Sequence, residues 1–249
     1  MASIVRERPG NPPRFSYTCK MTAMNKPEVR RRNRRGEGAQ LRADIVAAAR
    51  ELIEDTGTAN AVTLRAVARR VGIAAPSIYA HFADPEQIIR AVIAQAYEEF
   101  LRHLQSARRG IEDPRARLVA TCEAYLSFGA EQPHLYALMM GPNPTPDGTT
   151  SHDGRDLRLH DSGEGIERLV GAESFRLLVQ DVAATAAVDA SRTDDPFLTA
   201  TALWVALHGL VRLRADQPQG PWPDTRQLND LIIRRIALLE PASIADPER

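Results

Sequence analysis

The stretch LRAVARRVGIAAPSIYAHFADPE, residues 64–86, decides how the N-terminal part of this chain folds. Two short segments with apolar periodicity meet at Gly72, and Ala68, Gly72 and Ile78 are spaced four and six residues apart. A small residue lets two helices cross closely, a glycine takes the left-handed turn between them, and an apolar residue anchors the second helix to the first. The spacing therefore predicts a helix-turn-helix.

The second helix, expected over residues 75–82, has a face that suits DNA. A recognition helix enters the major groove with its N-terminal end, where small residues let the backbone approach. Ile78 and Phe82 are the expected inward positions. An ordinary helical corner, with its tyrosine and histidine partly buried, is the alternative on spacing alone. The face offered to bases and phosphates consists of Ala75, Ser77, Tyr79, Ala80 and His81.

Capping signals place further helices around this motif. A helix from Arg42 carries an apolar stripe that starts at Ile45, and Thr56-Gly57 ends it. Thr63 is a good N-cap for the next helix. Asp84 with Pro85 and Gln87 resembles a capping box that opens a long helix.

The remainder of the chain is also expected to be helical. Asp-Pro recurs before two more apolar-periodic runs, and no convincing strand or repeat appears, so the predicted fold class is all-α. The run over 197–215 is apolar nearly all round and should be buried on more than one side. The expected helices cover 114–140 (broken near Gln132-Pro133), 164–190, 197–215 and 225–240, the last with Leu228, Leu231, Ile232, Arg235 and Leu239 on one stripe.

Composition excludes several classes of protein. The 249 residues are 43% hydrophobic, enough for a sizeable core, and 5% aromatic, which favours helices over a β-sandwich. No run approaches the roughly 18 apolar residues of a membrane helix, and no signal peptide is visible, so we expect no membrane partner. Cys19 and Cys122 suggest neither a disulfide framework nor a metal site, which favours the cytoplasm.

Charge is distributed unevenly along a chain that is neutral overall. Residues 1–42 carry 11 Lys and Arg against 3 Asp and Glu, a net charge of +8, so the remainder carries −8. This asymmetry is typical of a basic arm that contacts nucleic acid, although a solvated tail is the simpler interpretation. Translation could begin at Met1, Met21 or Met24.

These signals predict a domain organisation. We expect a disordered Arg-rich arm over 1–36, a helix-turn-helix domain over 37–84, an effector-binding and dimerisation domain over 85–241 with a mobile loop at 141–163, and a tail over 242–249.

Residues 41–100 resemble the DNA-binding domain of the TetR family of bacterial transcriptional repressors. The resemblance is carried by RADIVAAARELIEDTG, VTLRAVARRVGIAAPSIYAHF and DPEQIIRAVI, and APSIYAHF after ARRVG is its most specific part. One position departs from the family: Pro85 stands where a phosphate-gripping lysine usually follows Asp84, so this grip on the phosphate is missing or moved. The resemblance implies DNA contacts by Thr63, Arg65, Ala75, Pro76, Ser77, Tyr79, Ala80 and His81.

The basic arm offers a substitute for the missing lysine. Residues 43–106 contain 6 Arg and 8 Asp and Glu, so the DNA-binding domain itself is net acidic. We hypothesise that the arm reaches into the adjacent minor groove or along the backbone. The arginines that would do so include Arg31, Arg32, Arg34 and Arg35, next to Arg30.

HLYALMMG and ALWVALHGLVRL are similar to a TetR-family ligand-binding domain marked by a Trp…His-Gly pattern, here Trp204, His208 and Gly209. This likeness implies an unknown small-molecule effector and a homodimer. The apolar run over 197–215 and the amphipathic last helix independently need a partner surface, which a second copy would supply. A dimer also lets two recognition helices reach half-sites about 34–36 Å apart.

The aromatic and methionine residues of the C-terminal part have two possible interpretations. They line a flexible apolar pocket, or they belong to the hydrophobic core. For the histidine at position 208, packing or a hydrogen bond is favoured over effector contact, and no second ligand stands three or four residues away. The acidic and His-rich segment 152–161 is interpreted as a linker rather than a metal site, and we expect no cofactor. The candidate effector-binding residues are Tyr125, Phe128, Met139, Met140, Trp204 and His208.

Three functions compete on this sequence. The favoured one is a homodimeric repressor that leaves operator DNA when an effector binds, with an activator as a variant. An effector-independent DNA-binding protein is the second. An enzyme is the third, and we find no paired carboxylate motif, His-x-x-x-His or Gly-rich phosphate loop to support it.

Overall fold

The computed structural model describes residues 38–141 and 172–239. Within these ranges the chain forms eight α-helices and two short 3-10 helices. The only strand-like pairing there is one isolated bridge between Ser191 and Leu239. The chain is all-α, as the sequence predicted. The helices are α1 (Gly38–Thr56), α2 (Leu64–Val71), α3 (Pro85–Ala107), α4 (Pro114–Glu131), α5 (Pro133–Met140), α6 (Ala172–Ala187), α7 (Pro196–Asp216) and α8 (Thr225–Ile236).

The N-terminal unit is built on the predicted apolar stripe of α1. Ile45, Ala49 and Ile53 are buried against α2 and α3. The helix begins at Gly38, four residues before the predicted Arg42. It ends where expected, because Gly57 takes a left-handed conformation with φ +71°.

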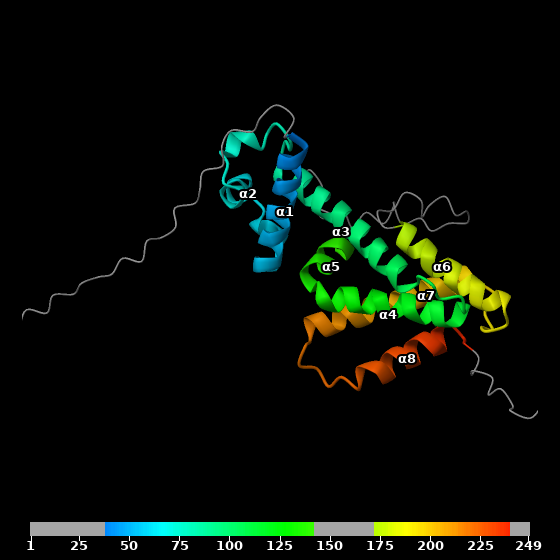
Figure 1. The fold of residues 1–249 in the computed structure, drawn as a ribbon. Coiled ribbons are helices and arrows are strands. Elements are labelled where there is room, and N and C mark those ends of the chain that lie inside the picture. Colours follow the sequence, from blue (N-terminus) through cyan, green and yellow to red (C-terminus); the bar gives the residue numbers. More distant parts are fainter. Residues whose placement is uncertain (1–37, 142–171, 240–249) are drawn as a thin grey trace, which may run out of the picture.

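α3 joins the two parts of the molecule (Figure 1). It packs on α1 and then continues into the larger bundle to pack on α4. The Asp84 carboxylate accepts from the backbone N–H of Gln87 at 2.7 Å, and Pro85 occupies the first turn. The Gln87 side chain reaches back to the N–H of Ala83 at 3.2 Å, one residue earlier than in a standard capping box.

The larger unit is a bundle in which α4, α6 and α7 pack on one another and α8 covers α7 and part of α4. Gln132 separates α4 from α5 because a residue before proline is excluded from the helical region, and its φ and ψ are −129° and 59°. α4 and α7 approach closely at Gly129, where a Cβ atom would lie 2.4 Å from the side chain of Val211. The break near Gln132-Pro133 is confirmed.

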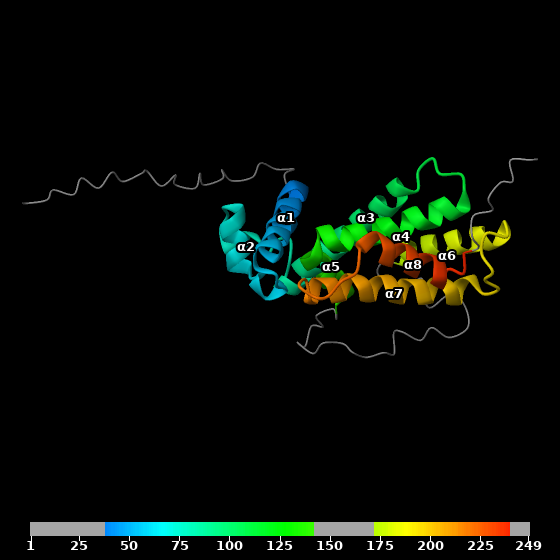
Figure 2. The same cartoon turned by 90° about the horizontal axis from the view of Figure 1, so that it is seen from below.

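α7 buries one face and exposes another, although its sequence predicted burial on more than one side. Leu203 and Leu207 are buried, whereas Leu198, Val205 and Leu213 are 64%, 58% and 51% exposed. By length and composition α7 could also cross a membrane, a test that core helices of soluble proteins pass as well. It runs along the outer edge of the bundle, against α4 and α6 (Figure 2). The exposed side is therefore an apolar surface without a partner in the single chain.

α8 is shorter than predicted. It ends at Ile236, and the left-handed Leu238 (φ 52°) then turns the chain so that Leu239 pairs with Ser191. The core contact of α8 is made by Ile233, which the predicted stripe did not include. Leu231, on that stripe, is 54% exposed. Leu228, Ile232 and Leu239 of the stripe are half-buried against the core, so the predicted stripe packs only in part.

Candidate DNA-binding and effector-binding sites

The turn of the helix-turn-helix is built around Gly72. Its φ of 77° and ψ of 33° are left-handed, and its N–H donates to the carbonyl of Ala68 at 2.9 Å. A Cβ atom at this position would meet nothing within 4 Å. The requirement for glycine is therefore conformational and not steric.

The segment predicted as a recognition helix over 75–82 is not a continuous α-helix in this structure. Ala75–Ser77 form a 3-10 helix, and hydrogen-bonded turns continue to Phe82. The N–H of Ile78 donates to Ala75 at 3.1 Å, three residues back, where an α-helix would bond four residues back. A segment this short gains little from a helical ladder, so the anchoring of its two apolar residues decides its shape. Both anchors, Ile78 and Phe82, are buried as predicted.

Most of the predicted DNA-contacting side chains are exposed. Tyr79 is 62% exposed, which rules out the interpretation of this tyrosine as a packing residue in a helical corner. The imidazole of His81 is half-buried. The hydroxyl of Thr63 caps α2 by accepting from the N–H of Ala66 at 3.1 Å, and its own hydrogen stays available to donate. Of the others, Arg65, Pro76, Ser77 and Ala80 are exposed and Ala75 is half-buried.

The charges on α2 divide into paired and unpaired arginines. Arg70 is held by Glu51 at 3.1 Å and Asp55 at 2.7 Å, and hydrogen bonds to these carboxylates raise its pKa. Arg65 and Arg69 have no carboxylate partner within residues 38–141 and 172–239. They are therefore the α2 cations available to phosphates, and the pattern of the sequence did not single out Arg69.

Two further points concern the charged residues around the motif. Arg42 lies over the ring of Phe82, 4.2 Å from its centroid, and so clamps the end of the recognition segment. Sequence reasoning missed this contact because cation and ring are forty residues apart.

The predicted arm residues Arg31, Arg32, Arg34 and Arg35 lie outside the described residues.

Three of the candidate effector-binding residues meet in the larger unit. The hydroxyls of Tyr125 and Tyr136 are 2.7 Å apart, and the Tyr136 hydroxyl is 2.8 Å from Nδ1 of His208. The ring of Trp204 lies 6.3 Å from that of His208. Tyr136, which joins the others, stands in HLYALMMG but was not singled out from the sequence.

Burial keeps this cluster uncharged. It lowers the pKa of His208, with a further contribution from the positive charge of Arg212. It raises the pKa of both Tyr125 and Tyr136. The three groups thus form a neutral chain of hydrogen bonds, which orients polar atoms inside an apolar region.

The other three candidates are placed differently. Phe128 packs on Phe100, with ring centroids 5.0 Å apart, and does not reach the imidazole of His208. The carbonyl of Met139 accepts from the Tyr97 hydroxyl at 2.8 Å. Met139 is buried and Met140 is half-buried. Phe128 and Met139 are part of the buried core, and Met140 packs against it.

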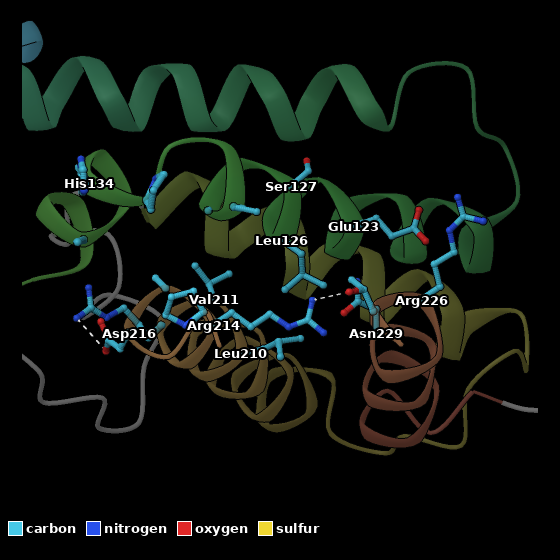
Figure 3. Close-up of a pocket in the computed structure, with 18 of the residues that line it drawn as sticks. Glu123, Leu126, Ser127, His134, Leu210, Val211, Arg214, Asp216, Arg226 and Asn229 are labelled. Atoms are coloured by element: carbon cyan, nitrogen blue, oxygen red, sulfur yellow. Dashed lines mark hydrogen bonds and ion pairs between the residues drawn. The ribbon is translucent and has the colours of Figure 1, made fainter. Parts of the chain in front are cut away.

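A large groove lies elsewhere, between α4 and α5 on one side and α7 and α8 on the other (Figure 3). Its volume is about 990 Å³. None of the six candidate effector-binding residues lines it. Its walls include Leu126, Val211, Arg214 and Asn229.

Metal binding finds no support in the part of the chain that the structure describes. No group of three or more His, Cys, Asp or Glu side chains gathers there. The His-rich segment 152–161 lies outside the described residues.

Comparison with known proteins identifies two matching family models. One, described as bacterial regulatory proteins of the tetR family, matches residues 45–92. The other, described as a tetracyclin repressor-like C-terminal domain, matches residues 118–236. The first covers the helix-turn-helix and the second covers most of the larger unit.

Individual proteins resemble this chain in sequence or in fold. The HTH-type transcriptional activator FasR of Mycolicibacterium smegmatis is 30% identical over 99 residues, which are 39% of this chain and 45% of that relative. The match therefore spans less than half of the curated relative. A protein of unknown function from Rhodococcus sp. RHA1 superposes with a TM-score of 0.62 at 24% identity, over 79% of this chain and 95% of its own. A tetR-family regulatory protein from Rhodococcus RHA1 superposes with a TM-score of 0.55 at 18% identity, over 79% and 94%.

Proposed function

This chain belongs to the TetR family of transcriptional regulators and carries the DNA-binding domain of that family, and from this premise we propose that it is a homodimeric repressor released from operator DNA by a small-molecule effector. The observation that carries the proposal is the exposed surface of Ser77 and Tyr79, held in place by the buried Ile78 and Phe82. A regulator, rather than an enzyme, is what the matching families indicate.

The proposed DNA interface combines base reading with phosphate contacts. Ser77 and the small residues around it face the bases, while Tyr79, His81 and Arg65 hold the backbone on either side. The hydroxyl of Thr63, at the start of α2, donates a hydrogen bond to the DNA. Arg69 adds a cation that has no carboxylate partner in the described residues. Ala75, Pro76 and Ala80 let the protein backbone come close.

The basic arm is proposed to bind phosphate in place of the lysine that Pro85 replaces. Each phosphate contact adds about 0.9 to the slope of log K against log salt. A chain without residues 1–36 should therefore show a shallower salt dependence than the full chain. An unchanged slope would exclude the arm from the interface.

The proposed dimer contact is the exposed apolar surface of the last two helices. Leu198, Val205 and Leu213 on α7 and Leu231 on α8 are each more than half exposed in the single chain. Packing these helices against their copies in a four-helix arrangement would bury them. It would also fix the distance between the two recognition segments, which an effector can then alter.

The cluster of Tyr125, Tyr136, Trp204 and His208 is proposed to sense the effector. It offers neutral polar groups inside an apolar surround, the usual character of a small-molecule site. Phe128, Met139 and Met140 are proposed to support its walls. The domain limits expected from the sequence (37–84 and 85–241) and a cytoplasmic location belong to the same proposal.

Fluorescence anisotropy of labelled DNA tests DNA reading directly. The full chain is titrated against DNA upstream of its own gene and against random DNA of equal length, at several salt concentrations. We expect a dissociation constant of about 10⁻⁸ M or tighter for the upstream DNA, well below that for random DNA. Equal affinity for both would exclude a repressor of its own locus.

A variant isolates the recognition surface in the same assay. Tyr79→Ala should weaken upstream binding about tenfold, because a hydrogen bond to a charged group is lost. Glu98→Ala, exposed on α3, is the control and should bind as the parent does. Equal binding by the Tyr79 variant would remove this tyrosine from the interface.

One observation favours an activator as the second candidate: the relative from Mycolicibacterium smegmatis is named as one. Transcription in vitro from the upstream promoter separates the two, with purified polymerase and increasing amounts of protein. Repression predicts falling transcript levels and activation predicts rising ones.

A further inference from the structure

The groove between α4, α5, α7 and α8 contains buried polar atoms that lack partners. Arg214 extends into it from α7 and points toward Asn229 of α8 (Figure 3). Its Nη1 donates to the Thr225 hydroxyl at 3.0 Å, but Nε and Nη2 are buried without a hydrogen-bond partner. Oδ1 of Asn229 is also buried and unpartnered. Buried polar atoms without partners are energetically costly. The groove therefore offers the N–H donors of Arg214 and the Asn229 oxygen acceptor to a ligand group.

The charge on Arg214 is also uncompensated. Neighbouring Arg212 pairs with Asp216 at 3.5 Å, whereas no carboxylate among the described residues lies within 4.0 Å of Arg214. Its guanidinium lies 5.5 Å from the centre of the Trp222 ring, which covers one side of the cation. Arg226 lines the same end of the groove, and the only acidic residues among those lining it are Glu123 and Asp216.

Part of the groove wall beside Arg214 is apolar. Leu126 of α4 and Leu210 and Val211 of α7 lie next to Arg214 along its walls. A volume of about 990 Å³ accommodates a small organic molecule. We propose that the groove binds an organic anion, whose carboxylate or phosphate pairs with Arg214 and whose apolar body lies along Leu126 and Val211.

This site is separate from the surface proposed for dimerisation. On α7, Leu210, Val211 and Arg214 face the groove, while Leu198 and Val205 are exposed on the opposite side of the helix. A second copy packed on Leu198 and Val205 therefore leaves the wall formed by Val211 and Arg214 uncovered.

The groove also reaches the DNA-binding unit. Gly57, at the end of α1, and His134 of α5 both line it. Nδ1 of His134 is 3.2 Å from the carbonyl oxygen of Glu54 in α1. An anion in the groove would therefore lie beside a contact that joins the two units. The assignment of this anion as an effector, at a site other than the Tyr125 cluster, rests on the proposed function, whereas the anion site itself does not.

Calorimetric titration of the full chain without DNA tests the site. Three probes share one apolar body and differ in charge: 2-naphthoate, 2-naphthyl phosphate and the neutral 2-naphthol. We expect at least one anion to bind once per chain and at least about tenfold more tightly than 2-naphthol, because a charge-assisted hydrogen bond separates them. The preferred anion then identifies the carboxylate or the phosphate as the ligand group. Equal binding of all three, or no binding, overturns the proposal.

Two variants place the binding at Arg214. Arg214→Gln removes the cation and should weaken binding of the preferred anion at least about tenfold. Asn229→Asp supplies a carboxylate beside the guanidinium, so it should compete with the anion to the same extent while leaving the melting temperature equal or higher. This second variant separates loss of the site from loss of the fold. Arg234→Gln, an exposed arginine paired with Asp230 on α8, is the control and should bind as the parent does. Parent-like binding by both groove variants overturns the assignment.

A final arm adds the preferred anion to the complex with upstream DNA. Release of DNA by the parent but not by Asn229→Asp supports the anion as effector. Anion binding in the groove with unchanged DNA affinity overturns the effector role and leaves the anion site standing. Failure of the chain to bind upstream DNA at all counts against the proposed function and not against the groove.

Discussion

His208 stands at one end of a chain of side-chain hydrogen bonds that passes through Tyr136 to Tyr125. Because burial lowers its pKa below the usual 6.5, the unfolded chain takes up a proton at this residue more readily than the folded chain. The contribution of the neutral imidazole to stability is therefore complete above pH 6.5 and is lost as the pH falls through the lowered folded value. The free energy of unfolding should decrease over this window.

Urea unfolding of the parent and of His208→Gln at intervals between pH 7.5 and 5.5 measures this effect. The parent should lose stability more steeply than the variant as the pH falls below 6.5. The variant retains every other titrating group. It therefore measures how the free energy of unfolding depends on pH when His208 does not contribute. Parallel curves would mean that the folded chain protonates this imidazole as easily as the unfolded chain does.

Some individual residues could be predicted from the sequence and others could not. Gly72, Ile78 and Phe82 were predictable because their partners lie within a few positions along one motif. Tyr136 escaped because its partner His208 is 72 residues away, and nothing local marks which face of α5 meets α7. The role of Arg214 in the groove was not predictable either. An arginine in the last turn of a helix is ordinarily interpreted as a favourable charge at the helix C-terminus, not as part of a binding site.

At the scale of elements, the turn between α2 and the recognition segment depends on backbone conformation. Gly72 has a φ of 77° and open space around its Cβ position. Gly72→Ala should cost about 1–2 kcal/mol of the free energy of unfolding, because the left-handed region is unfavourable for alanine. Gly72→Asn should cost clearly less, since asparagine tolerates this region. Equal costs in urea unfolding would point to crowding rather than conformation.

A second element-scale feature is the carboxylate that joins α6 to α3 and α4. Asp181 is fully buried and contacts Arg108 at 2.6 Å, Arg117 at 3.1 Å and the Thr121 hydroxyl at 2.6 Å. Asp181→Asn keeps the shape but leaves two partly buried cations without their counter-charge. It should cost about 3–5 kcal/mol in the free energy of unfolding, measured in urea.

Asp230→Asn is the matched control for that change. Asp230 pairs with Arg234 one helical turn away in α8, and both side chains are about half exposed. Its loss should change the free energy of unfolding by about 0.5 kcal/mol or less. Similar costs for the two variants would show that the Asp181 cluster contributes no more than a surface pair.

Helix starts were more predictable than helix interiors. The three Asp-Pro pairs within the described residues each begin a helix, with Asp84, Asp113 and Asp195 accepting from backbone N–H groups as N-caps do. Such signals are local, so sequence suffices to find them. The segment over 75–82 was expected to be helical because its apolar spacing fits a helix. Its hydrogen bonds instead follow the anchoring of Ile78 and Phe82 in the core, which is a tertiary effect.

At the scale of the whole molecule, the network around Arg50 ties the DNA-binding unit to the larger one. Arg50 of α1 contacts Glu99 of α3 at 2.6 Å and Gln132, between α4 and α5, at 2.7 Å. The side chain of Glu99 is mostly buried, so this pair is screened less than a surface pair. These contacts join α1 directly to α3 and to the residue between α4 and α5. The sequence predicted the two units, but their junction depends on residues too far apart to be paired by pattern.

The exposed apolar surface of α7 carries the last prediction. Val205 is 58% exposed in the single chain, so Val205→Glu should leave the helical circular dichroism of the chain unchanged. In the proposed dimer it would place unpaired charges inside an apolar contact, which is strongly unfavourable. Sedimentation velocity should therefore show a dimer for the parent and a monomer for the variant, with weaker binding to upstream DNA because one chain reaches one half-site. Gln105→Glu, exposed on α3, adds the same charge away from this surface and should remain dimeric. A dimeric Val205→Glu chain would move the contact between copies to another face, because a buried glutamate pair could not persist in an apolar interface.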